Sequence, residues 1–185
     1  MAALPEFQTS SSYVAGLAKA LTQLGRLEAV IARAPAEAAS MLKDPHAQRW
    51  WGAVESMQMV SAIAAEGGAA LVREVGRRAV AESLSPILRP LVSVLVAIAG
   101  PSPAALLSRW SQLTQAAVRN VHCEWKSTGP TSGTLDVTYS RDVPAEYTEL
   151  WDGGFAFVYE TTRTKGEPTR STHEGGHLHF ELSWT

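Results

Sequence analysis

The spacing of apolar residues changes near residue 120, and this change limits the possible fold more than any other feature. Before that point the chain is rich in Ala and Leu at helical spacing, as in Leu17, Leu21 and Leu24. After it, apolar and polar residues alternate, most strictly from His177 to Trp184. The first pattern is typical of helices and the second of strands. We therefore expect an α+β fold in which an N-terminal helical half packs on a C-terminal antiparallel sheet of about four strands.

Pro, Gly and Asp-Pro signals divide the two halves into elements. The predicted helices span about 12–34, 36–42, 45–65, 69–83, 86–99 and 103–119. The predicted strands span about 121–126, 135–140, 155–162 and 177–184, with a short helix or turn at 143–151 closed by Gly153-Gly154 and a polar loop at 165–176. We expect no strand before Ala99.

These elements predict one domain over residues 1–185, with a helical part at about 12–119 and a sheet part at about 120–185. In the last strand the apolar row should face the helices and the polar row should face away, because alternate residues point to opposite faces. The inward row is Leu178, Phe180, Leu182 and Trp184, and the outward row includes His177, His179 and Glu181. Cys123 lies in an apolar row, which predicts a buried structural thiol.

Composition excludes several function classes. The formal net charge is −2, so no strong field attracts nucleic acid or an anionic membrane. The apolar run 91–99 is far shorter than the roughly 20 residues that cross a bilayer. One cysteine and no visible secretory signal at the N-terminus fit a reducing compartment. We expect a cytoplasmic protein that binds neither nucleic acid nor membrane.

His173-Glu174-Gly175-Gly176-His177 matches the zinc-protease string H-E-x-x-H, which works only on a helix. The two glycines oppose a helix, since each costs about 1 kcal/mol in a helix interior. His177 and His179 share a strand face and supply two ligands, with His173, Glu181 or His122 as a third. We interpret this row as the polar face of a one-sided sheet and expect no metal. A metal-dependent enzyme that uses His177 and His179 stays open as an alternative.

The pair Trp50-Trp51 predicts one buried ring and one at the edge of the core, with a homodimer contact as the alternative. No G-x-S-x-G, G-x-G-x-x-G or Walker pattern occurs. We therefore predict no catalytic residue.

The stretch Gly68–Trp184 resembles an uncharacterised paralogous family of myxobacterial proteins. The matching segments are the Arg-bearing helix 73–83, the Ser102-Pro103 helix with Leu106-Leu107, Leu150-Trp151-Asp152-Gly153-Gly154-Phe155, and the strand ending Phe180-Glu181-Leu182-Ser183-Trp184. That family is distantly similar to small-molecule sensor domains of the 4-vinyl-reductase and haem–nitric-oxide-binding type. The resemblance implies a ligand held between a helical half and a twisted sheet. The haem sensors ligate iron through a helical His, and the predicted helices here offer only His46, so we carry over the architecture without a cofactor.

The function that these features favour is a non-enzymatic cytoplasmic domain that senses or binds a small apolar ligand or a protein partner. Its pocket would lie between the predicted helices 86–99 and 103–119 and the inner face of the sheet. Trp110 and Trp125 are the predicted ligand-binding residues. A structural homodimerisation module, built on the Trp50-Trp51 surface, is a further alternative.

Overall fold

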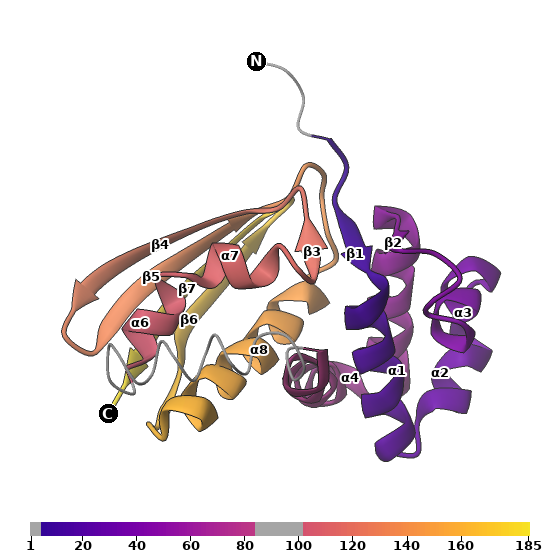
Figure 1. Cartoon of the computed structure of the whole chain (residues 1–185), viewed down its shortest axis with the longest axis horizontal. Helices are drawn as coiled ribbons and strands as arrows, with labels where there is room; N and C mark the ends of the chain where they lie inside the picture. The colour runs from indigo at the N-terminus through magenta and orange to yellow at the C-terminus, as the bar shows by residue number, and fades with distance from the viewer. Residues whose placement is uncertain (1–4, 84–101) are drawn as a thin grey trace.

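The structure is a computed structural model that describes residues 5–83 and 102–185 (Figure 1). Its helices are α1 (Ser11–Gln23), α2 (Leu27–Arg33), α3 (Ala36–Lys43), α4 (Ala53–Ser83), α6 (Pro103–Leu107), α7 (Trp110–Thr114) and α8 (Glu146–Thr162). Its strands are β1 (Gln8–Ser10), β2 (Trp50–Trp51), β3 (Val118–Arg119), β4 (His122–Gly129), β5 (Ser132–Thr138), β6 (Gly166–Glu174) and β7 (His177–Trp184). The α+β class is confirmed. The helix predicted at 86–99, with its apolar run, lies outside the described residues.

A four-stranded antiparallel sheet in the order β4-β5-β7-β6 forms one side of the molecule (Figure 1). Helix α8 packs against its inner face, where the Phe155 ring meets Phe180 edge to face with centroids 5.0 Å apart. Helices α4 and α1 follow as further layers, with α2 and α3 beyond them (Figure 1). The predicted inward row of β7 is confirmed, since all four of its side chains are buried: Leu178, Phe180, Leu182 and Trp184.

Helix α8 begins in the segment predicted as a short helix or turn and continues through the residues predicted as a third strand. The predicted strand 155–162 and the predicted closure at Gly153-Gly154 are therefore both wrong. Gly153 lies inside the helix because α8 crosses α4 there so closely that a Cβ atom would overlap the carbonyl oxygen of Arg73. On the α4 side, a Cβ at Gly76 would come within 2.6 Å of the Leu150 carbonyl oxygen. These two glycines serve backbone contact, not a turn.

The segment predicted as a polar loop at 165–176 is mostly strand β6, at the edge of the sheet. It pairs with β7 over its length, for example Ser171 with Phe180. Its side chains are polar and exposed or half-buried, so no apolar row marks it in the sequence. Backbone hydrogen bonds alone define this strand, and a polar edge also protects a sheet from pairing with other chains.

The small sheet β2-β1-β3 makes the expectation of no strand before Ala99 wrong. Asp44-Pro45 was expected to start a helix, yet the chain turns there and α4 begins only at Ala53. The cause is Trp51, which pairs with Thr9 across the β1–β2 ladder while its indole nitrogen donates to the Pro45 carbonyl at 2.9 Å. Trp51 is buried, and Trp50 is half-buried beneath the Arg119 guanidinium. The prediction of one buried ring and one ring at the edge of the core is therefore confirmed, although the two residues lie on a strand.

Three of the predicted helices are divided, kinked or shortened in the structure. Gly25, at φ +65°, divides 12–34 into α1 and α2, because this left-handed conformation ends a helix. The predicted break at Gly67-Gly68 is confirmed as a kink inside α4, with Gly68 at φ +66°. The predicted helix 103–119 is shorter: α6 and α7 are separated at Ser108-Arg109, and the chain then extends to pair β3 with β1. No helix in the described ranges is both long and apolar enough to cross a bilayer.

The crossing of α4 and α8 predicts opposite effects for two adjacent glycines. Gly153→Ala should lower the free energy of unfolding by about 1–3 kcal/mol, because its methyl group would meet backbone atoms that cannot move aside. Gly154→Ala should leave it unchanged or raise it by up to about 1 kcal/mol, since its Cβ would lie 3.4 Å from the Trp110 ring and Ala favours the helix. Urea unfolding of both variants measures the contrast, and equal effects would refute the close crossing.

The two faces of β7 predict a second contrast. Phe180→Ala should cost about 3–5 kcal/mol of unfolding free energy, because its ring is 0% exposed and packs on Phe155. Glu181→Ala, one residue on, should cost less than about 0.5 kcal/mol, since its contact to Arg170 is loose at 3.8 Å and partly exposed. Chemical denaturation measures both. A Phe180→Ala cost below about 1 kcal/mol would place that ring at the surface.

Candidate functional site

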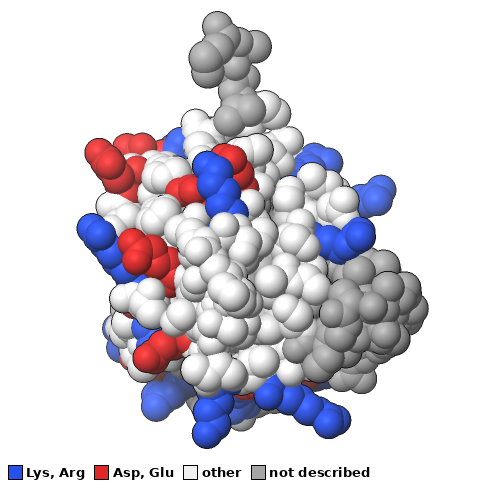
Figure 2. Space-filling model, turned by 90° about the vertical axis from the view of Figure 1, so that its left-hand side faces the viewer, with Lys and Arg blue, Asp and Glu red and all other residues white. Residues whose placement is uncertain are grey.

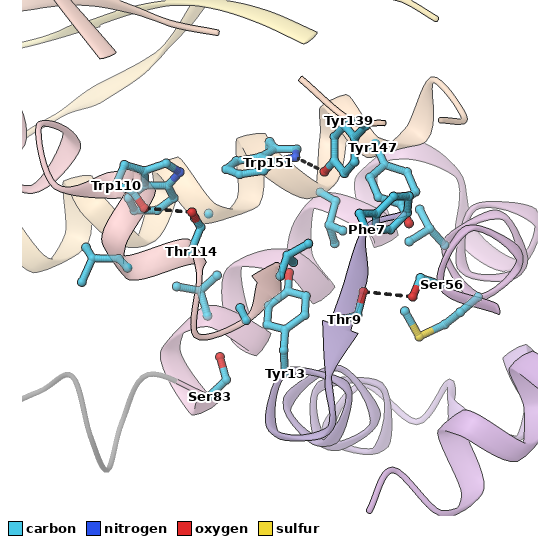
Figure 3. Close-up of a pocket in the computed structure, with 18 residues that line it drawn as sticks. Phe7, Thr9, Tyr13, Ser56, Ser83, Trp110, Thr114, Tyr139, Tyr147 and Trp151 are labelled. Carbon is cyan, nitrogen blue, oxygen red and sulfur yellow. Dashed lines mark hydrogen bonds between the residues drawn. The ribbon is translucent and has the colours of Figure 1, made fainter. Parts of the chain in front are cut away.

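A cavity of about 70 Å³ lies where α1 and α4 meet α7 and α8 (Figure 3). Strands β1 and β3 close it from the side. Its lining is mostly aromatic and aliphatic, and none of the described lining residues carries a charge. The lining consists of Phe7, Thr9, Tyr13, Ser56, Met59, Val60, Val80, Ser83, Trp110, Leu113, Thr114, Ala117, Val118, Tyr139, Tyr147, Leu150, Trp151 and Gly154.

Two aromatic groups hold the walls in place. Phe7, Tyr139 and Tyr147 meet edge to face, with centroids 4.9–6.1 Å apart. Trp110 and Trp151 lie side by side at 6.4 Å. A hydrogen bond of 2.8 Å from the Trp151 indole nitrogen to the Tyr139 hydroxyl joins the two groups (Figure 3). Large rings packed in this way lose little freedom on binding, so the cavity is preformed.

Most polar groups in the lining are satisfied within the protein. The Ser56 hydroxyl donates to the Gly52 carbonyl at 2.7 Å and lies 2.9 Å from the Thr9 hydroxyl (Figure 3). The Thr114 hydroxyl donates to the Trp110 carbonyl at 2.9 Å. Burial raises the pKa of Tyr13 and Tyr147, so these phenols stay neutral at physiological pH. Two buried polar atoms of the lining, Trp110 Nε1 and Ser83 Oγ, have no hydrogen-bond partner in the described structure.

The two tryptophans predicted as ligand contacts lie in different places. Trp110, on α7, lines the cavity and is 3% exposed. Trp125, on β4, lies outside it and packs on Trp184 with ring centroids 6.3 Å apart. The inner face of the large sheet supplies no strand residue to the lining, and Tyr139 comes just after β5. The expected pocket is therefore displaced from the sheet toward α1 and α4, and its predicted 86–99 wall falls outside the described residues.

Sequence reasoning missed most of the lining. Phe7 and Tyr13 come from the N-terminal residues, whereas Tyr147 and Trp151 come from α8, where only a short helix or turn was predicted. A signal was present in α8: Tyr147, Leu150, Trp151 and Gly154 recur at helical spacing and all line the cavity. Reading Gly153-Gly154 as a turn concealed that pattern.

The histidine row lies on the opposite face of the sheet from α8. His177 Nε2 is 3.3 Å and His179 Nδ1 is 2.7 Å from the same oxygen of Asp136, on the neighbouring strand β5. His173 instead contacts the Val143 carbonyl at 2.7 Å. The H-E-x-x-H string forms the β6–β7 hairpin with Gly175 at φ +58°, not a helix. Within residues 5–83 and 102–185, no group of three or more His, Cys, Asp or Glu is arranged to hold a metal ion.

Cys123 is buried, as predicted, and burial raises the pKa of its thiol to about 11. A thiol that stays protonated is a poor nucleophile. Figure 2 shows positively and negatively charged side chains around the margin of the face that it presents, with uncharged residues at the centre.

Asp152 is a buried carboxylate beside the cavity wall, on α8. Burial raises the pKa of its carboxyl to about 6, the neighbouring charge of Glu149 adds to this, and Arg73 opposes it from 3.5 Å. Its Oδ1 atom has no hydrogen-bond partner in the described part of the chain. The α4–α8 contact therefore contains a carboxyl group whose pKa burial raises to about 6.

Comparison with solved structures identifies the fold. An Fe(II) unliganded H-NOX protein from K. algicida superposes with a TM-score of 0.68 at 10% identity, covering 95% of this chain and 96% of that one. An oxygen-binding H-NOX domain related to soluble guanylate cyclases gives 0.63 at 13% identity, with 95% and 94% covered. A third H-NOX structure gives 0.60 at 14%, with 93% and 94% covered. These matches show the fold expected from the resemblance to the haem–nitric-oxide-binding type. No protein-family model and no curated protein matches the sequence.

Haem, which the fold family implies, does not fit the residues present. None of the five histidines lines the cavity: His46 is exposed in a turn after α3, and the other four lie on strands of the large sheet. The cavity of about 70 Å³ is also too small for a porphyrin, since benzene alone occupies an engineered cavity of roughly 150 Å³. The residues that line the cavity thus supply no histidine ligand for a haem iron.

Asp152 predicts a specific pH dependence of stability. Its pKa of about 6 in the folded state lies above the ordinary 3.8, so between about pH 4 and 6 the folded state binds more protons than the unfolded state. The free energy of unfolding should therefore fall as pH rises through this window. Asp152→Asn should match the wild type near pH 4.5 and exceed it near pH 7.5, as measured by urea unfolding at both pH values. Equal pH dependence in the two proteins would contradict the assignment.

Proposed function

We propose that this chain is a non-enzymatic binding or sensor domain whose ligand is a small apolar molecule held between α1, α4, α7 and α8. The observation that carries the proposal is the preformed cavity, with its aromatic and aliphatic lining and few polar atoms. Small-molecule sites in proteins have this character. In this proposal the chain acts as a single cytoplasmic domain without a cofactor, and Trp110 is a ligand contact.

The position of the cavity supports a sensing role. It is bounded by α1 and α4 from the helical half and by α7 and α8, which lie between that half and the sheet. A ligand there touches both parts of the molecule, so its binding energy depends on how they are arranged. Solved structures of the same fold include an oxygen-binding domain, which shows that the fold holds a small-molecule site in another protein.

Xenon tests whether the cavity takes an apolar guest, because it occupies dry apolar cavities without needing a hydrogen bond. In the wild type, xenon should cause saturable NMR shifts in the methyl groups of Val60, Val80 and Leu113, which line the cavity. Gly154→Leu should abolish these shifts, since a Cβ at Gly154 points toward Trp110 and Val80 and a longer side chain fills the space between them.

The matched control is Ala47→Leu, which adds the same side chain at an exposed position outside the cavity lining. It should bind xenon as the wild type does. Thermal unfolding establishes that each variant is folded before xenon is added. The proposal fails if the folded wild type shows no saturable shifts at the lining methyl groups, or if folded Gly154→Leu retains them.

A further inference from the structure

The indole nitrogen of Trp110 is the least explained polar atom of the cavity. The side chain is 3% exposed, and its Nε1 atom is buried without a hydrogen-bond partner in the described structure. Its Cζ2 atom, one bond from the carbon that bears Nε1, faces Gly154, which also lines the cavity. Figure 3 shows the nitrogen on the side of the ring nearer Trp151. The other cavity indole, Trp151, donates to Tyr139, so the two rings differ in this respect.

The chemistry of this atom selects the ligand. An indole N–H donates and cannot accept, so only a group with a lone pair satisfies it. Leaving such a donor unpaired in a buried site is costly, and a ligand that supplies the acceptor removes that cost. Ser83 Oγ, the second unpartnered atom of the lining, is a hydroxyl that also donates. The cavity therefore favours an acceptor over a purely apolar guest of the same shape.

Charge and size narrow the choice further. No Lys, Arg or His is among the described residues of the lining, so none of these residues offers an ionised carboxylate a counter-charge. A volume of about 70 Å³ admits a guest of only a few non-hydrogen atoms. Resting on the proposed binding function, we infer that the ligand is a small, uncharged, mainly apolar molecule with one acceptor, such as a carbonyl oxygen, that binds Trp110 Nε1.

Acetone, isobutene and acetate test this inference, because they share one planar shape and differ in the group that would meet Trp110. The affinities are weak, with a Kd no tighter than roughly 0.05 mM for molecules of this size, so NMR titration is the measurement. Acetone should move the Trp110 indole proton downfield, isobutene should not, and acetate at pH 7 should not bind in the cavity.

Trp110→Phe removes the donor and keeps an aromatic ring. The ratio of the Kd for acetone to the Kd for isobutene should rise by about 3–10-fold in this variant, the usual effect of one neutral hydrogen bond. The matched control is Trp125→Phe, which changes the same group outside the cavity and should leave the ratio unchanged. Comparing ratios cancels the different solubilities of the two probes and any general weakening of the cavity.

The outcomes separate the two proposals. If acetone and isobutene both bind the wild type but Trp110→Phe leaves their ratio unchanged, the inference is overturned while the binding function stands. An ordered water on Trp110 Nε1 would give that result. Acetate binding in the cavity with an affinity like that of acetone would also overturn it. If neither neutral probe binds the folded wild type, the proposed function fails along with the inference.

Discussion

The close crossing of α4 and α8 is the contact on which the rest of the structure depends. Gly76 and Gly153 let the two backbones approach to a distance that any side chain would prevent. Residues on either side of this crossing then meet in fixed positions: Val80 and Ser83 of α4 and Leu150 and Gly154 of α8 all line the cavity. The distance between α4 and α8 at this crossing therefore sets the width of the cavity. Because protein interiors are densely packed, a change in that distance also moves the cavity walls.

Electrostatic contacts hold the same two helices together along their outer side. Arg73 meets Glu149 at 2.6 Å, and Arg77 joins Glu74 on its own helix to Glu160 on α8 at 2.7 and 3.0 Å. These pairs are partly exposed, so each adds little stability, and they lie along the outer side of the α4–α8 contact. Asp152 lies on the inner side of this row, where burial outweighs the nearby Arg73. The helix pair is thus polar at its rim and neutral at the cavity.

The spacing of apolar residues predicted the class of the fold and many of its elements, because this spacing can be read within each segment alone. The inward row of β7, the buried Cys123 and the kink at Gly67-Gly68 all followed from neighbouring residues. The failures have a common physical cause, which is that long-range contact overrode local preference. Gly153-Gly154 reads as a turn unless the partner helix is known, and polar β6 is a strand only because β7 lies beside it. The site depended on such contacts, so Trp110 was predicted and its partners on α1 and α8 were missed.

Strands β1 and β3 close the cavity with residues that are remote in the sequence, since Gln8 pairs with Arg119 across 111 positions. Joining such distant points costs chain entropy, which is offset only once the elements between them have packed together. Strands of two or three residues also contribute few backbone hydrogen bonds, so they belong to the least stable part of a fold. The Phe7–Tyr139 contact spans 132 positions, further than the β1–β3 ladder, so an aromatic wall of the cavity depends on the same long-range closure.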